Sequence, residues 1–407
     1  MTRLRLATLG CAAVLALLAP ALVACNPDDP SQLGTTSGAG GCPVETTNGS
    51  TGTGEGGDGQ TSTGTGQPDP TILDQRVLSY PEALRTASLK LVGALPTMTQ
   101  IDAVKNAPDK KAAYEAEIDA MMNDVRFKVR MVDFYRNELR IGGSAAMDTA
   151  PVFMARIAVE GRPYADLFTA TSNTCPTFDG TNFVDGDCNN ANPTAGVLTN
   201  PGVLAHYYGN LAFRRVRFFQ EAFACRKQPA ELSPMSIPMG AGDYTSPWPF
   251  DSIAGTSNGG RIDFLDTSSA ICANCHSTAN HRAPLWAMFD ANGQQQSTFQ
   301  VNIPVQGVPV AELSDWLPPG ETTAYKLGQD AADLAELGAF MAQDDEIQSC
   351  AVARIWNMAM SKGDIVNDAA SVPNSTIAPL VDQFKATNGN LRPIIRAVFT
   401  HDDFVRF

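Results

Sequence analysis

The sequence predicts a mostly α-helical protein with long irregular loops and little strand. Apolar residues recur at the helical period of 3.6 in many segments between residues 80 and 399. Stretches rich in Gly, Pro and Asp separate these segments and favour loops. One stretch, 299–310, alternates apolar and polar residues, but Pro304 and Pro309 interrupt it, so it forms at most a short strand. Helix packing is therefore expected to build the fold.

The first 25 residues have the pattern of an export signal. Arg3 and Arg5 precede an uncharged apolar run over 6–22, which is short for a membrane span. The small residues before Cys25 suit cleavage, and the segment resembles a bacterial lipoprotein signal. We expect Cys25 to carry a lipid anchor, with an ordinary signal peptide or a transmembrane anchor as the alternatives. Asn26 then favours the outer membrane, with the protein on the periplasmic or cell-surface side.

The next segment, 26–70, is a tether rich in Gly, Ser and Thr. It has too few apolar residues to offset its ordering entropy. A flexible chain of this length has a mean reach of about 35–40 Å. Cys42 lies within it and has no obvious partner. The rest of the chain has an ordinary globular composition and is long enough for two or three cores.

Several helices can be assigned from their periodicity and end signals. Tyr80-Pro81 begins the first, which Gly93 ends, and Thr99 with Asp102 offers a cap for a short second one. The expected buried side of the first helix comprises Ala83, Leu84, Ala87, Leu89, Leu91 and Val92. Further helices are expected within 109–123, 126–140, 162–168, 201–225, 330–342, 345–360, 377–386 and 391–399. The stripe of Phe127, Met131, Phe134 and Tyr135 is expected to be core.

We divide the globular part into four segments. These are an N-terminal helical domain (71–170), a segment with a disulfide loop, a helix and an irregular stretch (171–262), a segment around a Cys-x-x-Cys-His motif (263–343), and a C-terminal helical block (344–407).

Four cysteines are candidates for disulfides. Cys175 and Cys188 flank a loop rich in Gly and Asp, and exported proteins commonly close such loops. Calcium binding by Asp179, Asp185 and Asp187 is a weaker alternative, because their spacing is not that of an EF-hand. Cys225 and Cys350 are the second pair, since free thiols are uncommon in exported proteins.

Three arginines, Arg214, Arg215 and Arg217, lie among phenylalanines in the predicted helix before Cys225. They could hold a haem propionate, but the acidic chain, with a net charge of −14, favours an ion-paired or solvated helix face.

The motif Cys272-Ala273-Asn274-Cys275-His276 predicts a c-type haem site. Two thiols at this spacing can bond both haem vinyl groups, and the adjacent imidazole can bind the iron. A zinc site would lack at least one ligand, a thioredoxin-like pair would need a preceding strand, and a plain disulfide at this spacing is strained. We expect one covalent haem c in a pocket among the helices, with 284–289 lining it.

The sixth iron ligand would decide between an electron carrier and a catalyst. Met239 is the distal candidate, with Met235 beside it, because prolines hold both in an irregular loop. Met288, Met341 and Met358 are alternatives. The remaining histidines, His206, His281 and His401, are expected to be structural or on the surface.

Several stretches resemble the exported multi-segment c-type cytochromes of planctomycetes and myxobacteria, whose domains have no known function. The matching stretches are Arg85–Thr97, Arg162–Leu167, Ala195–Thr199 with the arginine pair and Cys225, Cys272–His276 closed by Phe289-Asp290, and the tail from Asp344 through Cys350 and Trp356 to Phe404. The resemblance implies a mostly helical exported protein with one covalent haem and supplies no substrate. It departs at Ala279, Asn280 and His281, where relatives often carry a methionine and Asp-Pro.

These observations together favour an exported monohaem cytochrome that passes single electrons between redox proteins. A haem-dependent oxidase or peroxidase subunit is the enzyme alternative, and a lipoprotein with a structural zinc site is the haem-free one. An electron carrier is favoured over a stand-alone enzyme. The acidic charge argues against nucleic acid and in favour of neutral or basic partners.

Overall fold

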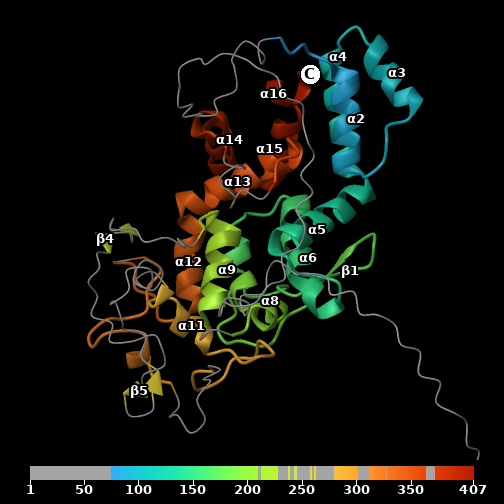
Figure 1. Cartoon of the computed structure of the whole chain (residues 1–407). Helices are drawn as coiled ribbons and strands as arrows, with labels where there is room; N and C mark the ends of the chain where they lie inside the picture. The colour runs from blue at the N-terminus through green and yellow to red at the C-terminus, as the bar shows by residue number, and fades with distance from the viewer. Residues whose placement is uncertain are drawn as a thin grey trace, which may run out of the picture. The chain divides into compact units, whose positions relative to one another are not determined.

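A computed structural model of the 407-residue chain describes residues 75–209, 212–227, 237–238, 243–244, 257–258, 261–262, 279–300, 311–326, 328–363 and 372–407. All of these belong to one unit of the chain, 67–407. This described part is mostly helical with little strand, which confirms the predicted fold class at that level (Figure 1). No helix in it combines the length and apolarity that crossing a bilayer requires.

The N-terminal half of the described part is a succession of helices. They are α2 (Tyr80–Leu91), α3 (Met98–Asn106), α4 (Lys110–Asn123), α5 (Val125–Leu139), α6 (Ala145–Glu160), α7 (Asp166–Thr169), α8 (Pro201–His206) and α9 (Phe213–Ala224), with the 3₁₀ helix η2 (Gly196–Thr199).

The C-terminal half continues in the same way. It contains α11 (Ala283–Ala287), α12 (Leu334–Gln343), α13 (Asp345–Ala359), α14 (Asn374–Ala386), α15 (Leu391–Phe399) and α16 (Asp402–Val405), with the 3₁₀ helix η4 (Leu313–Asp315).

The strands among the described residues form three antiparallel pairs of two residues each. They are β1 (Thr177–Phe178) with β2 (Phe183–Val184), β3 (Ile237–Pro238) with β4 (Asp243–Tyr244), and β5 (Ser257–Asn258) with β6 (Arg261–Ile262). The 299–310 stretch lies mostly outside the described residues.

The helix start signals mostly fall where the sequence places them. Pro81 lies in the first turn of α2, and the Asp109 carboxylate accepts a hydrogen bond from the Ala112 N–H at 3.0 Å to cap α4. The predicted cap of the short helix α3 is wrong by two residues. Thr97, not Thr99, forms the capping box with Gln100, because its hydroxyl accepts from the Gln100 N–H while the Gln100 side chain accepts from the Thr97 N–H.

The predicted core stripe is confirmed in α5, while one residue of α2 was misplaced. Phe127, Met131 and Tyr135 are buried, and Phe134 is partly buried and packs against the core. Leu89, expected on the buried side of α2, is 43% exposed. The other residues expected on that side are buried, as predicted: Ala83, Leu84, Ala87, Leu91 and Val92.

Helix α6 was not among the predicted helices. Ser144 caps its start, and Gly161, with a φ of +70°, ends it in the left-handed conformation that glycine adopts without strain. Most of its residues after Thr149 are buried, including Pro151 inside the helix, so it lacks the polar stripe by which amphipathic helices are recognised.

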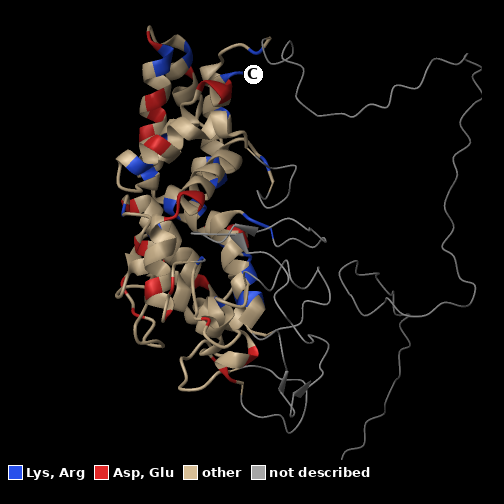
Figure 2. Cartoon of the chain, turned by 90° about the vertical axis from the view of Figure 1, so that its left-hand side faces the viewer, with Lys and Arg blue, Asp and Glu red and all other residues tan. Residues whose placement is uncertain are grey.

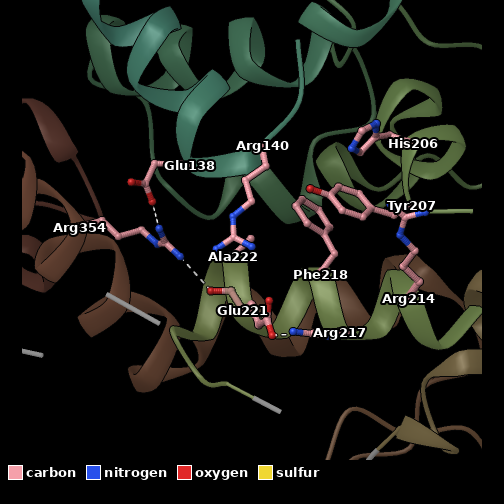
Figure 3. Close-up of a pocket in the computed structure, with 10 residues that line it drawn as sticks. All are labelled: Glu138, Arg140, His206, Tyr207, Arg214, Arg217, Phe218, Glu221, Ala222 and Arg354. Atoms are coloured by element: carbon pink, nitrogen blue, oxygen red, sulfur yellow. Dashed lines mark hydrogen bonds and ion pairs between the residues drawn. The ribbon is translucent and has the colours of Figure 1, made fainter. Parts of the chain in front are cut away.

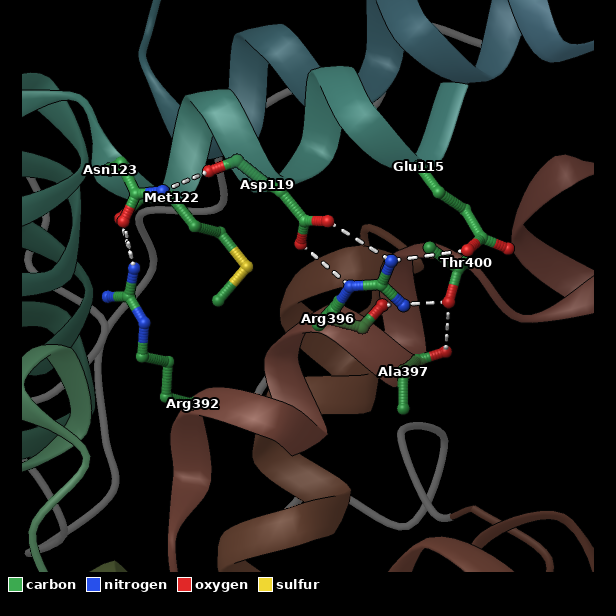
Figure 4. Close-up of polar contacts among 8 residues, drawn as sticks. All are labelled: Glu115, Asp119, Met122, Asn123, Arg392, Arg396, Ala397 and Thr400. Carbon is green, nitrogen blue, oxygen red and sulfur yellow. Dashed lines mark hydrogen bonds and ion pairs between the residues drawn. The ribbon is translucent and has the colours of Figure 1, made fainter. Parts of the chain in front are cut away.

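The last helices pack back against the first ones. The Arg396 guanidinium on α15 contacts the Asp119 and Glu115 carboxylates on α4 at 2.7 and 3.1 Å, and Arg392 donates to the Asn123 side chain at 2.7 Å (Figure 4). Buried Tyr114 donates its hydroxyl hydrogen to the Phe399 carbonyl at 2.6 Å. One hydrophobic core consequently includes side chains from α2 to α16.

Both predicted disulfides are present. Cys175 and Cys188 close the loop that contains β1 and β2, with their Cα atoms 5.0 Å apart. Cys225, which follows α9, bonds Cys350 in α13 with a Cα separation of 5.5 Å. The second bond joins positions 125 residues apart and links two helices of the core.

Candidate functional site

The predicted haem ligands lie outside the described residues. These are Cys272, Cys275 and His276, together with the distal candidates Met239 and Met235. Cys25 and Cys42 also lie outside them. The described segment that follows the motif, 279–300, provides the adjoining structure.

Helix α11 begins seven residues after His276 and is firmly held. Its Trp286 indole N–H donates to the Leu198 carbonyl at 3.2 Å. The indole ring stacks on Phe219 of α9, with centroids 4.7 Å apart and an angle of 8° between the planes. Aromatic pairs of this size contribute well beyond a single apolar contact. The chain just after the motif is thus anchored to α9.

Arg215 supplies the second anchor. Its five N–H groups make five hydrogen bonds of 2.6–2.9 Å to four backbone carbonyls, those of Leu204, Trp286, Phe289 and Asp290. The side chain is buried, and burial lowers its pKa to about 10, which leaves it charged at neutral pH. The expectation of an ion-paired or solvated face is wrong for this residue, because the carbonyl ends of α8 and α11 converge on it.

Asp290 shapes the loop that follows. One carboxylate oxygen accepts the backbone N–H groups of Asn292 and Gln294 at 2.8 and 2.9 Å, and the other accepts from the Gln296 side chain at 3.0 Å. These bonds close a turn after α11. Phe289-Asp290, the pair that closes the resemblance to the cytochrome block, therefore ends a rigid element.

An apolar cavity of about 310 Å³ lies against α11. The residues that line it are Pro193, Pro284, Leu285, Met288, Phe289, Gln295, Phe299, Leu313, Thr323, Ala332, Asp333 and Leu334. Four of them belong to the stretch 284–289 that was expected to line the haem pocket. The alternative ligand Met288 lies in this wall, whereas Met341 is buried in the core and Met358 packs against it.

The other three histidines have different surroundings. His281 is buried, with Nε2 3.4 Å from a Glu321 carboxylate oxygen. His401 caps α16, because its Nδ1 accepts the Asp403 N–H at 3.1 Å. His206 is exposed at the end of α8.

A second cavity, of about 350 Å³, was not anticipated from the sequence (Figure 3). It is lined by Glu138, Arg140, His206, Tyr207, Arg214, Arg217, Phe218, Glu221, Ala222 and Arg354. These residues come from the end of α5, from α8, from one face of α9 and from α13. Because these segments are far apart in the chain, the sequence contains almost no local pattern that predicts the cavity. The one indication is that Arg214 and Arg217, at positions i and i+3, share a helix face.

Ion pairs and a hydrogen bond fix the walls of this arginine-lined cavity. Arg354 pairs with the Glu138 carboxylate and donates to the Glu221 carbonyl at 2.9 Å. Arg217 contacts the Glu221 carboxylate at 2.8 Å. For Arg217 the expected ion-paired, solvated position is therefore correct.

Two aromatic rings form the floor of the same cavity. Tyr207 stacks on Phe218 with centroids 4.0 Å apart and donates its hydroxyl hydrogen to the Leu139 carbonyl at 2.6 Å. The Arg214 guanidinium lies over the Tyr207 ring, 5.5 Å from its centroid. Partial burial, followed by the charge of Arg214, lowers the pKa of His206 below its ordinary value of 6.5. Both effects favour the neutral form of the imidazole.

Within the described residues, no group of His, Cys, Asp and Glu side chains is arranged to hold a metal ion. The three loop aspartates considered for calcium have other contacts. Asp179 accepts the backbone N–H groups of Thr181 and Asn182, Asp185 pairs with Arg156, and Asp187 accepts the Asn173 N–H.

Comparison of the chain with protein-family models, with curated proteins and with solved structures finds no match.

Proposed function

We propose that the chain is an exported, lipid-anchored monohaem c-type cytochrome that transfers single electrons between redox proteins. The observation that carries the proposal is the Cys272-x-x-Cys275-His276 motif, in a sequence whose residues 1–25 have the pattern expected of an export signal. Two thiols and an imidazole in this order are the donor set that covalent haem attachment uses. Covalent attachment also belongs to the oxidising side of the membrane, where disulfides form.

The chain's own residues would have distinct roles. Cys272 and Cys275 would form the thioethers, and His276 would supply the proximal nitrogen. Met239, Met235 and Met288 are the distal candidates, and Met288 has the added support of lying in the apolar cavity beside α11. A bound haem would supply one-electron redox chemistry.

The frame around α11 supports this proposal physically. Electron transfer requires little rearrangement around a redox centre, and a ligand must be held in place by the residues around it. Arg215 donates three hydrogen bonds to the carbonyls of Trp286, Phe289 and Asp290, in α11 and just after it. Trp286 adds one hydrogen bond to the Leu198 carbonyl and its stacked ring on Phe219. Trp286, ten residues after His276, is therefore held against α9.

The test is a haem stain on a denaturing gel with a pyridine haemochrome spectrum, on protein exported by a host with c-type maturation machinery. We expect a c-type spectrum and a stained band that Cys272→Ala weakens. Cys42→Ala, which removes a cysteine from the tether, is the matched control and should leave both unchanged. A correctly exported but colourless wild-type protein would contradict the proposal, and zinc in its metal analysis would favour the haem-free lipoprotein.

Ferrous spectra separate the carrier from the enzyme. A carrier with a distal methionine excludes carbon monoxide at neutral pH, whereas an oxidase or peroxidase with an open iron position binds it. Binding of carbon monoxide by the folded protein would therefore favour the enzyme alternative.

A further inference from the structure

The arginine-lined cavity is unusual for this chain because of its charge. The whole sequence has 29 basic and 43 acidic residues, and Figure 2 shows both kinds interspersed along the described helices. The cavity wall nevertheless contains four arginines against two glutamates. Like charges gathered at a concave surface raise the local concentration of the opposite ion.

We propose that this cavity binds a small multivalent anion that carries carboxylate or phosphate groups. Arginine is suited to such ligands because its planar guanidinium donates two parallel hydrogen bonds to either group. The cavity volume of about 350 Å³ is at the lower end of the range for small-molecule sites. The proposal is independent of haem, because every residue that carries it belongs to α5, α8, α9, α13 or their ends.

The arginines differ in how they could serve a ligand. Arg354 is nearly buried and is committed to Glu138 and the Glu221 carbonyl, so it fixes the wall and contributes its charge. Arg214 and Arg217 are exposed on the same face of α9, where both can reach a ligand that enters from solvent. Arg217 also contacts the Glu221 carboxylate at 2.8 Å, so a bound anion would share that guanidinium with Glu221. Figure 3 shows Arg140 pointing toward α9 from the end of α5, so that positive charge flanks the cavity on several sides.

The aromatic floor of the cavity and a nearby disulfide suit a specific binding site rather than a diffuse charged surface. The stacked pair of Tyr207 and Phe218 gives an apolar floor against which the carbon skeleton of an organic anion can lie. The disulfide between Cys225 and Cys350 lies one helical turn beyond Glu221 on α9 and one turn before Arg354 on α13. It holds these two walls together, so that little ordering entropy remains to be lost on binding.

Isothermal titration calorimetry of the exported full chain tests the proposal. The titrants are citrate, inorganic phosphate and acetate, at pH 7 and constant ionic strength. We expect citrate or phosphate to bind with a Kd at least about tenfold below that of acetate, since each added charge-assisted hydrogen bond is worth about that factor. Whichever of the two binds more tightly identifies carboxylate or phosphate as the natural group.

Matched charge variants locate the binding. Arg214→Gln and Arg217→Gln should each weaken binding by about tenfold. Arg126→Gln removes an equally exposed arginine from α5, outside the cavity, and should leave the Kd unchanged. Because all three side chains are exposed, all three variants should retain the unfolding temperature of the wild type. The proposal would be overturned if none of the three anions bound. It would also be overturned if Arg126→Gln weakened binding as much as the cavity variants do. Both outcomes can be judged whether or not the protein carries haem.

Discussion

Helix α9 has two sides that use the same residue type in opposite ways. Arg215 points into the protein and binds four backbone carbonyls, whereas Arg214 and Arg217 are exposed at the arginine-lined cavity. The three residues lie within four positions of one another. Successive residues of a helix are turned by about 100°, so Arg214 and Arg217 share a face that Arg215 does not. The function of an arginine here depends on helical phase, not on its neighbours in sequence.

The largest expected effect is at the buried side. Arg215→Met should lower the free energy of unfolding by about 4 kcal/mol or more, because three buried carbonyls and the partly buried one of Asp290 each lose a donor at about 1–3 kcal/mol. Arg217→Met removes an exposed ion pair from the other side of the same helix and should cost within about 0.5 kcal/mol. Urea unfolding followed by circular dichroism compares the two.

Arg215→Lys sharpens the same comparison. A single ammonium cannot reproduce the forked set of five hydrogen bonds, so lysine should recover only part of the lost stability. If Arg215→Lys matched the wild type, charge alone would be holding α11, and the proposed role of the guanidinium geometry would be wrong.

The disulfide between Cys225 and Cys350 comes next in expected effect. Changing both cysteines to serine should lower the free energy of unfolding by about 3 kcal/mol, since the bond closes a long loop in the unfolded chain. Replacing Cys175 and Cys188 in the same way should cost less, because that loop is much shorter. Chemical denaturation of both double variants gives the order, and the reverse order would show that strain or residual structure dominates.

A smaller effect is expected at the floor of the cavity. Tyr207→Phe keeps the ring that stacks on Phe218 but removes the hydrogen bond to the Leu139 carbonyl. The expected loss is about 1 kcal/mol of unfolding free energy. A loss below about 0.3 kcal/mol in urea unfolding would mean that water replaces the phenol at that carbonyl.

The pH dependence of His206 is the most local test. Its pKa lies below 6.5 in the folded protein, so the neutral form stabilises the fold above pH 6.5 and this contribution is lost as pH falls through the folded pKa. Arg214→Gln should raise that pKa, because it removes a nearby positive charge. Nuclear magnetic resonance titration, with His206→Gln to assign the signal, measures the shift. An unchanged pKa would place Arg214 too far from the imidazole to act on it.

Much of the fold follows from local signals in the sequence. The helix α15 was predicted at its observed bounds, and both disulfides were paired correctly. Helix α6 was missed because it is apolar on nearly every side and contains Pro151, so neither periodicity nor composition marks it. Its burial depends on contacts with α5 and later helices that no local pattern encodes.

The candidate sites divide in the same way. The Cys-x-x-Cys-His motif is contiguous, so its chemistry can be predicted from the five residues 272–276. The arginine-lined cavity is assembled from Glu138, His206, Glu221 and Arg354 among others, which are up to 216 positions apart in the sequence, and only tertiary packing brings them together. Arg215 was misjudged because its acceptors are backbone carbonyls, which have no signature in the side-chain sequence.

The central claim is covalent haem at the motif, and peptide mapping tests it most directly. Trypsin cleaves after Arg261 and Arg282, and no Lys or Arg lies between them, so one peptide, 262–282, contains Cys272, Cys275 and His276. Digestion of the exported protein, with separation monitored by haem absorbance and by mass, should place the haem on this peptide alone. The same peptide without haem, or haem absorbance on any other peptide, would contradict the account.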